Sequence, residues 1–124
     1  MTSSTVVVVD DNDTTRAMLR GILRQDGLDV IGEAKDGESA LQVVRRLKPA
    51  LVCLDVQMPG SNGLEVLQTI KAELPSVRVL MVTGATERET VQAAIAGGAS
   101  GYVVKPFNAA NVTTAVRRAL GLAA

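Results

Sequence analysis

The sequence predicts an α/β domain in which five parallel strands alternate with five helices that cover both faces of the sheet. Two observations support this prediction. Short apolar runs recur along the chain, and each is followed by a segment with apolar residues at helical spacing. Strict alternation of this kind is typical of parallel sheets, because each helix returns the chain to the start of the next strand. No linker, repeat or low-complexity tract interrupts the pattern, so we expect residues 1–124 to form a single domain.

The five apolar runs differ in how deeply each strand is expected to be buried. Three of them are strongly apolar and indicate interior strands, at residues 5–9, 50–54 and 77–82. The second run, residues 28–34, includes Asp29 and Glu33 and is typical of an edge strand. The last run is residues 101–104. Together they predict a sheet with a largely aliphatic interior.

The intervening segments each place apolar residues on one helical face. For four of the helices these residues are Leu19, Ile22 and Leu23; Ala40, Leu41, Val44 and Leu47; Val66, Leu67, Ile70 and Leu74; and Val112, Ala115, Val116, Ala119 and Leu120. The remaining helix, fourth along the chain, is expected to begin at the capping-box pattern 86–89 and to end at Gly97-Gly98. Asn108 is a suitable N-cap for the fifth helix.

Composition excludes several classes of function. The 13 basic and 13 acidic residues balance, and aromatic residues make up 2% of the chain, so neither a basic field nor stacking platforms for nucleic acid are expected. No run approaches the ~18 apolar residues of a membrane span, and no signal peptide is visible. Cys53 lies within an apolar run and indicates a buried thiol. We therefore expect a soluble cytoplasmic protein without direct contacts to DNA or membrane.

Polar side chains follow four of the five predicted strands. Asp10 and Asp11 come after the first strand, Asp55 after the third, Thr83 after the fourth and Lys105 after the fifth. In open parallel sheets, ligands bind beyond the carboxyl ends of the strands. We therefore expect these five side chains to gather at one end of the sheet.

Three carboxylates in one place need positive charge. Two like charges ~4 Å apart cost about 4 kcal/mol at an effective dielectric constant near 20. Lys105 supplies part of the compensation, and a hard divalent cation, Mg²⁺ or Mn²⁺, would supply the rest. Zinc does not suit a chain without histidine. With its charge compensated, Asp55 can act as a nucleophile on phosphorus, while Thr83 and Lys105 bind phosphoryl oxygens.

Four segments carry a resemblance to a known family. They are Val8-Val9-Asp10-Asp11-Asn12, residues 54–65 (LDVQMPGSNGLE), Val82-Thr83-Gly84-Ala85 and Val104-Lys105-Pro106-Phe107. In order and spacing they resemble the receiver domain of bacterial response regulators in two-component signalling, over essentially the whole chain. The resemblance implies a flavodoxin-like fold with strand order 2-1-3-4-5.

The resemblance also implies a role for each site residue. Asp55 matches the phosphoacceptor and Thr83 the switch hydroxyl. Lys105 matches the phosphate-binding lysine, followed by a cis bond to Pro106. The remaining matches are Asp10, Asp11 and the main-chain carbonyl of Gln57 as Mg²⁺ ligands, and Tyr102 as the aromatic residue that changes rotamer.

These roles imply a signalling switch rather than an enzyme. A sensor histidine kinase or a histidine phosphotransfer protein would phosphorylate Asp55. Thr83 would then move toward the phosphate, Tyr102 would turn inward, and the surface formed by the fourth helix, fifth strand and fifth helix would change its affinity for a downstream protein. The same surface could form a phosphorylation-dependent homodimer.

Other interpretations remain open at this stage. A phosphohydrolase or phosphotransferase with an aspartate nucleophile commonly has a second acid two residues on, where this chain has Gln57. Nucleotide binding on the same fold would need a glycine-rich phosphate loop, and none follows the first strand. Gln57 and Ala85 are positions that influence the lifetime of the phosphorylated state in the family. The chain is either a stand-alone domain or one part of a longer regulator.

Overall fold

The central feature of the fold is a five-stranded parallel sheet. The computed structural model describes residues 4–58, 60–84 and 88–122. The sheet has the order β2-β1-β3-β6-β7 and every neighbouring pair is parallel. Its strands are β1 (Thr5–Val9), β2 (Asp29–Ala34), β3 (Leu51–Asp55), β6 (Arg78–Thr83) and β7 (Gly101–Val104). Counting these five alone, the order is 2-1-3-4-5, which confirms the predicted fold class and topology.

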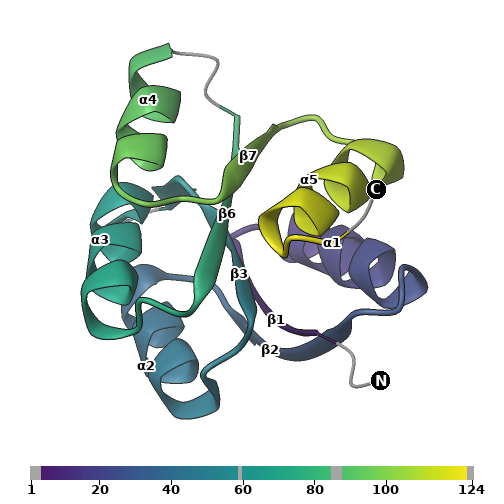
Figure 1. The fold of residues 1–124 in the computed structure, drawn as a ribbon, viewed down its shortest axis with the longest axis horizontal. Helices are drawn as coiled ribbons and strands as arrows, with labels where there is room; N and C mark the ends of the chain where they lie inside the picture. The colour runs from purple at the N-terminus through teal and green to yellow at the C-terminus, as the bar shows by residue number, and fades with distance from the viewer. Residues whose placement is uncertain (1–3, 59, 85–87, 123–124) are drawn as a thin grey trace.

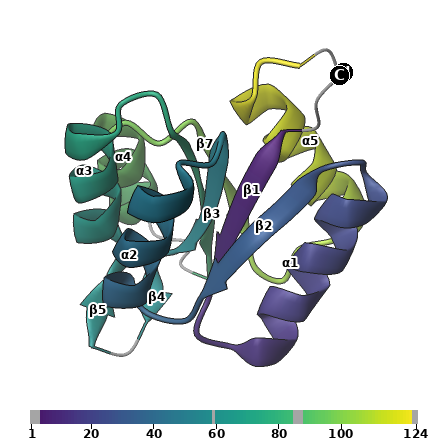
Figure 2. The same cartoon turned by 90° about the horizontal axis from the view of Figure 1, so that it is seen from below.

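Helices cover both faces of the sheet (Figures 1 and 2). On one face lie α1 (Asp13–Gln25) and α5 (Ala109–Ala119). On the other face lie α2 (Gly37–Leu47), α3 (Gly63–Glu73) and α4 (Arg88–Ala96). Among the described residues, none of the helices has both the length and the apolar character needed to cross a bilayer.

The interior strands contribute side chains alternately to two core layers. In β1, Val7 and Val9 belong to the layer beneath α2 and α3, whereas Val6 and Val8 face α1 and α5. All four valines are at most 1% exposed. Successive side chains of a strand point to opposite faces, so a strand covered on both sides is apolar at every position. This is why the continuous valine run predicted an interior strand correctly.

Side-chain caps mark where the helices begin. The Asn12 side chain accepts a hydrogen bond from Thr15 N at 2.9 Å at the start of α1. Asn108 caps α5 by accepting from Asn111 N at 2.8 Å, as predicted. The capping-box residues Thr86 and Glu87 lie outside the described residues. At the other end, α4 stops at Ala96, and Gly98 adopts a φ of +102°, which confirms the predicted end of that helix.

Two details of the fold differ from the prediction. The third and fourth predicted strands are each displaced by one residue, so that Asp55 and Thr83 are the last residues of β3 and β6 rather than the first residues beyond them. A short antiparallel hairpin also follows β3, formed by β4 (Gln57–Met58) and β5 (Ser61–Asn62). Two-residue strands are too short to produce a readable periodicity.

Candidate functional site

Asp10 and Asp11 follow β1 directly but occupy opposite environments. Asp10 is completely buried, whereas Asp11 is exposed. The main chain of Asp10 continues the pairing with β2, because its N–H donates to the Ala34 carbonyl at 3.1 Å. Its Oδ1 accepts a hydrogen bond from Asn12 N at 2.9 Å. Asp10 is therefore held by the end of the sheet, while Asp11 faces solvent beside it.

Asp55 lies at the end of the neighbouring strand and shares a cation with Asp10. It is 3% exposed, and its Oδ1 accepts a hydrogen bond from Gln57 N at 3.1 Å. Lys105 Nζ lies 3.2 Å from Asp55 Oδ2 and 2.9 Å from Asp10 Oδ2. One ammonium group thus compensates two buried carboxylates, which leaves net negative charge when both are ionised.

The three aspartates form a group that could hold a metal ion. Asp10, Asp11 and Asp55 each offer a carboxylate oxygen, and these oxygens all lie within 4.8 Å of one another. Within the described part of the chain, the buried Asp10 Oδ2 has the Lys105 ammonium, 2.9 Å away, as its partner. Three carboxylates this close together, with one ammonium group beside two of them, fit a hard divalent cation such as Mg²⁺.

Burial governs the electrostatics of the pair formed by Asp55 and Lys105. Desolvation raises the pKa of Asp55 and the charge of Asp10 adds to this, while Lys105 and the Gln57 N–H act in the opposite direction. For Lys105, burial is the largest influence and lowers the pKa, but Asp10 and Asp55 together outweigh it and the net shift is upward. The lysine is therefore charged at neutral pH, and a further cation would favour the ionised form of Asp55.

Thr83 and Lys105 reach the same end of the sheet. Thr83 is 1% exposed and ends β6, which pairs with β3 through Asp55 and Val82. The Lys105 N–H donates to the Thr83 carbonyl at 2.7 Å, which ties the end of β6 to the loop after β7. The Lys105-Pro106 bond is cis, as predicted. The sequence-predicted cluster of Asp10, Asp11, Asp55, Thr83 and Lys105 thus forms at the carboxyl end of the sheet.

Tyr102 does not join this cluster. It is 45% exposed on β7, opposite Met81 of β6, and lines a groove together with Ala115 and Arg118 of α5. The structure therefore places it on the outer surface beside α5. Ala85, which the sequence analysis singled out together with Gln57, lies outside the described residues.

Comparison with known proteins identifies the family. The model of the response regulator receiver domain matches residues 6–117. The chain belongs to this family. Like other receiver domains of two-component response regulators, it is a signalling domain. The curated Protein CcdB of Bacillus subtilis is 39% identical to this receiver over 116 residues, which cover 94% of this chain and 97% of that protein.

Solved receiver structures share the same fold. The signal receiver domain of NarL from Mycobacterium tuberculosis superposes with a TM-score of 0.92 at 30% identity, covering 98% of each chain. A chain of the CheX-CheY-BeF3-Mg²⁺ complex from Borrelia burgdorferi gives a TM-score of 0.89 at 29% identity, covering 92% of this receiver and 87% of that chain.

One residue beside the receiver site is missed by the sequence analysis. Arg16 of α1 donates from Nη1 to the main-chain carbonyl of Asp10 at 2.8 Å. It is one of several arginines on polar helix faces, and the pattern of apolar residues contains no signal that separates it from the others. The contact spans only six residues, and it depends on how the loop after β1 enters α1.

Proposed function

We propose that this receiver domain is a switch controlled by phosphorylation of Asp55. The donor would be a phosphohistidine on a sensor histidine kinase or on a histidine phosphotransfer protein. The observation that supports the proposal most directly is the pair of buried carboxylates, Asp10 and Asp55, that share the Lys105 ammonium at the end of the sheet. Burying so much like charge is costly, and function is the usual reason for retaining it.

We further propose that the site takes Mg²⁺, or Mn²⁺ in its place. Asp10, Asp11, Asp55 and the main-chain carbonyl of Gln57 would hold the ion. Two observations support these ligands: the carboxylate oxygens within 4.8 Å of one another, and the hydrogen bond that keeps the Gln57 main chain beside Asp55. When bound, the ion would neutralise the carboxylates and the phosphoryl oxygens, which is the main requirement of phosphoryl transfer.

The chain's own groups account for the rest of the transfer. A carboxylate oxygen of Asp55 attacks phosphorus, an O–P bond forms, the P–N bond of the phosphohistidine breaks, and its electron pair returns to the imidazole nitrogen. The product on Asp55 is an acyl phosphate. Lys105, already 3.2 Å from Asp55, is placed to pair with a phosphoryl oxygen, and the buried Thr83 hydroxyl would take another. Because the chemistry is directed at the protein itself, the domain would act as a switch rather than as an enzyme.

The output would be a change in binding of a protein partner. Movement of Thr83 toward the phosphate would displace its carbonyl, which accepts a hydrogen bond from the Lys105 N–H, and would thereby shift the loop after β7. Tyr102, 45% exposed in the groove beside α5, would then turn inward and change the surface formed by α4, β7 and α5. In this scheme phosphate favours a state that is already accessible. The same surface would be available for a homodimer of the phosphorylated form.

Intact-mass spectrometry after incubation with acetyl phosphate tests the proposal. We expect one added phosphoryl group on the wild type with Mg²⁺, and none with EDTA or in Asp55→Asn. Asp29→Asn is the matched control, because Asp29 is an exposed aspartate at the other end of the sheet. An adduct that persists in Asp55→Asn would rule out Asp55 as the acceptor. Turnover of the donor without any adduct on the protein would indicate a phosphohydrolase instead.

A further inference from the structure

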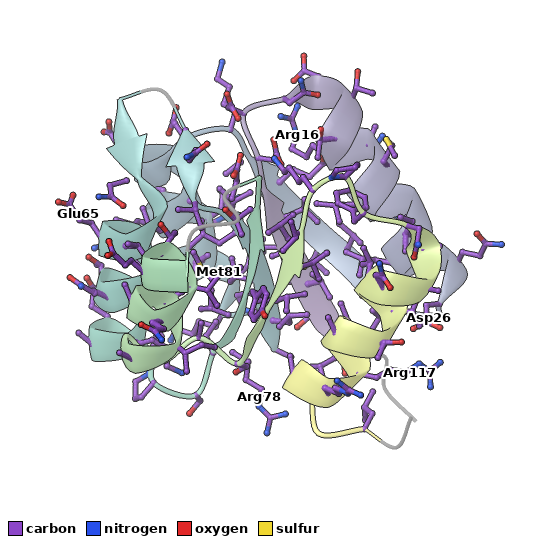
Figure 3. The ribbon with its side chains drawn as sticks, turned by 90° about the horizontal axis from the view of Figure 1, so that it is seen from above. Arg16, Asp26, Glu65, Arg78, Met81 and Arg117 are labelled. Atoms are coloured by element: carbon purple, nitrogen blue, oxygen red, sulfur yellow. The ribbon has the colours of Figure 1, made fainter. Side chains whose placement is uncertain are left out.

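We propose that Arg16 is a positioning residue that holds the main chain of Asp10 and thereby sets the affinity of the site for Mg²⁺. The inference rests on the proposed function, because it assumes that the aspartate cluster binds this ion. It concerns a residue outside the cluster, on α1, which Figure 3 labels at the end of the molecule where the loop from β1 enters the helix.

The guanidinium group of Arg16 donates hydrogen bonds to three different residues. Nη1 donates to the Asp10 carbonyl at 2.8 Å, Nη2 to Asp13 Oδ1 at 2.6 Å, and Nε to Glu33 Oε1 at 3.2 Å. The side chain is only 19% exposed. Arg16 therefore joins the loop after β1, the first turn of α1 and strand β2 through one rigid planar group.

Glu33 is in turn held by a second arginine. Arg20 Nη1 donates to Glu33 Oε1 at 3.0 Å and to Oε2 at 2.8 Å. Both arginines thus share the same carboxylate, but of the two only Arg16 has a hydrogen bond to Asp10 among the described residues. Arg20 consequently provides a control with the same charge and a common partner.

The contacts of Asp10 explain why its main chain matters. Its N–H is paired with Ala34 and its carbonyl with Arg16, so the peptide groups on both sides of the residue are held. Of its carboxylate oxygens, Oδ1 accepts from Asn12 N, which leaves Oδ2 for Lys105 and a cation. Without Arg16 the peptide after Asp10 can rotate, and the carboxylate oxygens of Asp10 and Asp11 are no longer held within 4.8 Å of each other. Loss of a group that orients a metal ligand commonly weakens metal affinity by about 10–100-fold.

Positioning and simple charge predict opposite changes. Arg16 is a cation near a cation site, so its removal would tighten Mg²⁺ binding if charge alone mattered, the more so because Asp13 would lose its ion-pair partner and Glu33 would keep only Arg20. If Arg16 positions Asp10, its removal weakens binding. The sign of the change therefore separates the two explanations.

The test is calorimetric titration of metal-free protein with MgCl₂ for the wild type, Arg16→Gln and Arg20→Gln. We expect the Kd for Mg²⁺ to be about 10-fold higher in Arg16→Gln than in the wild type. In Arg20→Gln the Kd should be unchanged or slightly lower. In EDTA, amide hydrogen exchange of Asn12, whose N–H donates to Asp10, should be faster in Arg16→Gln than in Arg20→Gln. An unchanged or tighter Kd in Arg16→Gln would overturn the proposal.

A second variant covers the case in which Arg16→Gln does not fold. Arg16→Lys keeps the charge, but one ammonium group cannot reach Asp10, Asp13 and Glu33 together. Weaker Mg²⁺ binding by folded Arg16→Lys would support positioning, and wild-type binding would overturn it. Failure of the proposed function is distinguishable, because the wild type would then show no Mg²⁺-dependent adduct with acetyl phosphate.

Discussion

Asp55 shows how the burial of a single charged side chain can lower the stability of the fold. Its carboxylate is buried beside a second carboxylate, and one lysine serves both. Burial is the main reason that its pKa is raised, and Asp10 contributes in the same direction. A carboxyl group whose folded pKa is raised stabilises the fold only while it is protonated. That contribution is lost as the pH rises from the ordinary carboxyl pKa, about 4, through the raised value.

We therefore expect Asp55→Asn to stabilise the metal-free protein at neutral pH by about 1 kcal/mol, a size common for substitutions that relieve a functional site. Urea denaturation in EDTA at several pH values would measure it. The difference from the wild type should shrink as the pH falls, since both side chains are then neutral. A variant that is less stable than the wild type at pH 7 would contradict this account of Asp55.

At the scale of elements, the hairpin formed by β4 and β5 returns the chain against the end of β3. Gly63, the first residue of α3, is where the two segments meet. A Cβ atom at this position would lie 2.5 Å from the Asp55 carbonyl oxygen and 2.6 Å from Val56 Cα. The Gly63 N–H also donates to the Val56 carbonyl at 2.9 Å. The close approach of α3 to the end of β3 therefore requires glycine.

Gly63→Ala is expected to destabilise the protein by about 1–3 kcal/mol, because backbone atoms must move to admit the methyl group. It should also weaken Mg²⁺ binding, since the displaced main chain carries Asp55. Gly21→Ala is the control: Gly21 is an exposed residue within α1, a Cβ there meets nothing within 4 Å, and the change should stabilise by up to about 1 kcal/mol. Urea denaturation and calorimetric titration measure both effects. Equal changes in the free energy of unfolding of the two variants would show that the main chain around Gly63 admits a methyl group without cost.

Considered as a whole, the molecule is a sheet enclosed between two helical layers, and its most protected position is the middle strand β3. Cys53 lies in this strand between Val8 of β1 and Leu80 of β6, and it is 0% exposed. Burial raises the pKa of its thiol to about 12. Both features make the thiol unreactive while the fold is intact.

Iodoacetamide should therefore modify Cys53 at pH 8 only when the whole domain unfolds. Time-resolved mass spectrometry would measure the labelling rate. We expect this rate to match the one calculated from the rate of global unfolding, or from the equilibrium population of unfolded protein, both measured by urea denaturation. Protein unfolded in urea provides the fast reference. Mg²⁺ should slow labelling if it binds only the folded state. Rapid labelling of native protein would mean that β3 becomes accessible through local opening.

Local patterns in the sequence were enough to predict much of this fold. The valine run of β1, the apolar faces of the helices and the Asn108 cap each depend on neighbours within a few residues, and each matches the structure. The same patterns located the site, because residues that follow parallel strands meet at one end of the sheet. The hairpin after β3 escaped prediction because its strands span only two residues each.

The sequence by itself determined the fold class, the family and the set of residues at the carboxyl end of the sheet. Only the tertiary structure decided which of those residues are buried and which groups they contact. It buries Asp10 and exposes the adjacent Asp11, gives Lys105 to Asp10 and Asp55 together, and joins Arg16 of α1 to Glu33 of β2. Periodicity and capping are properties of short segments, whereas burial and shared partners depend on which distant segments the sheet order places side by side.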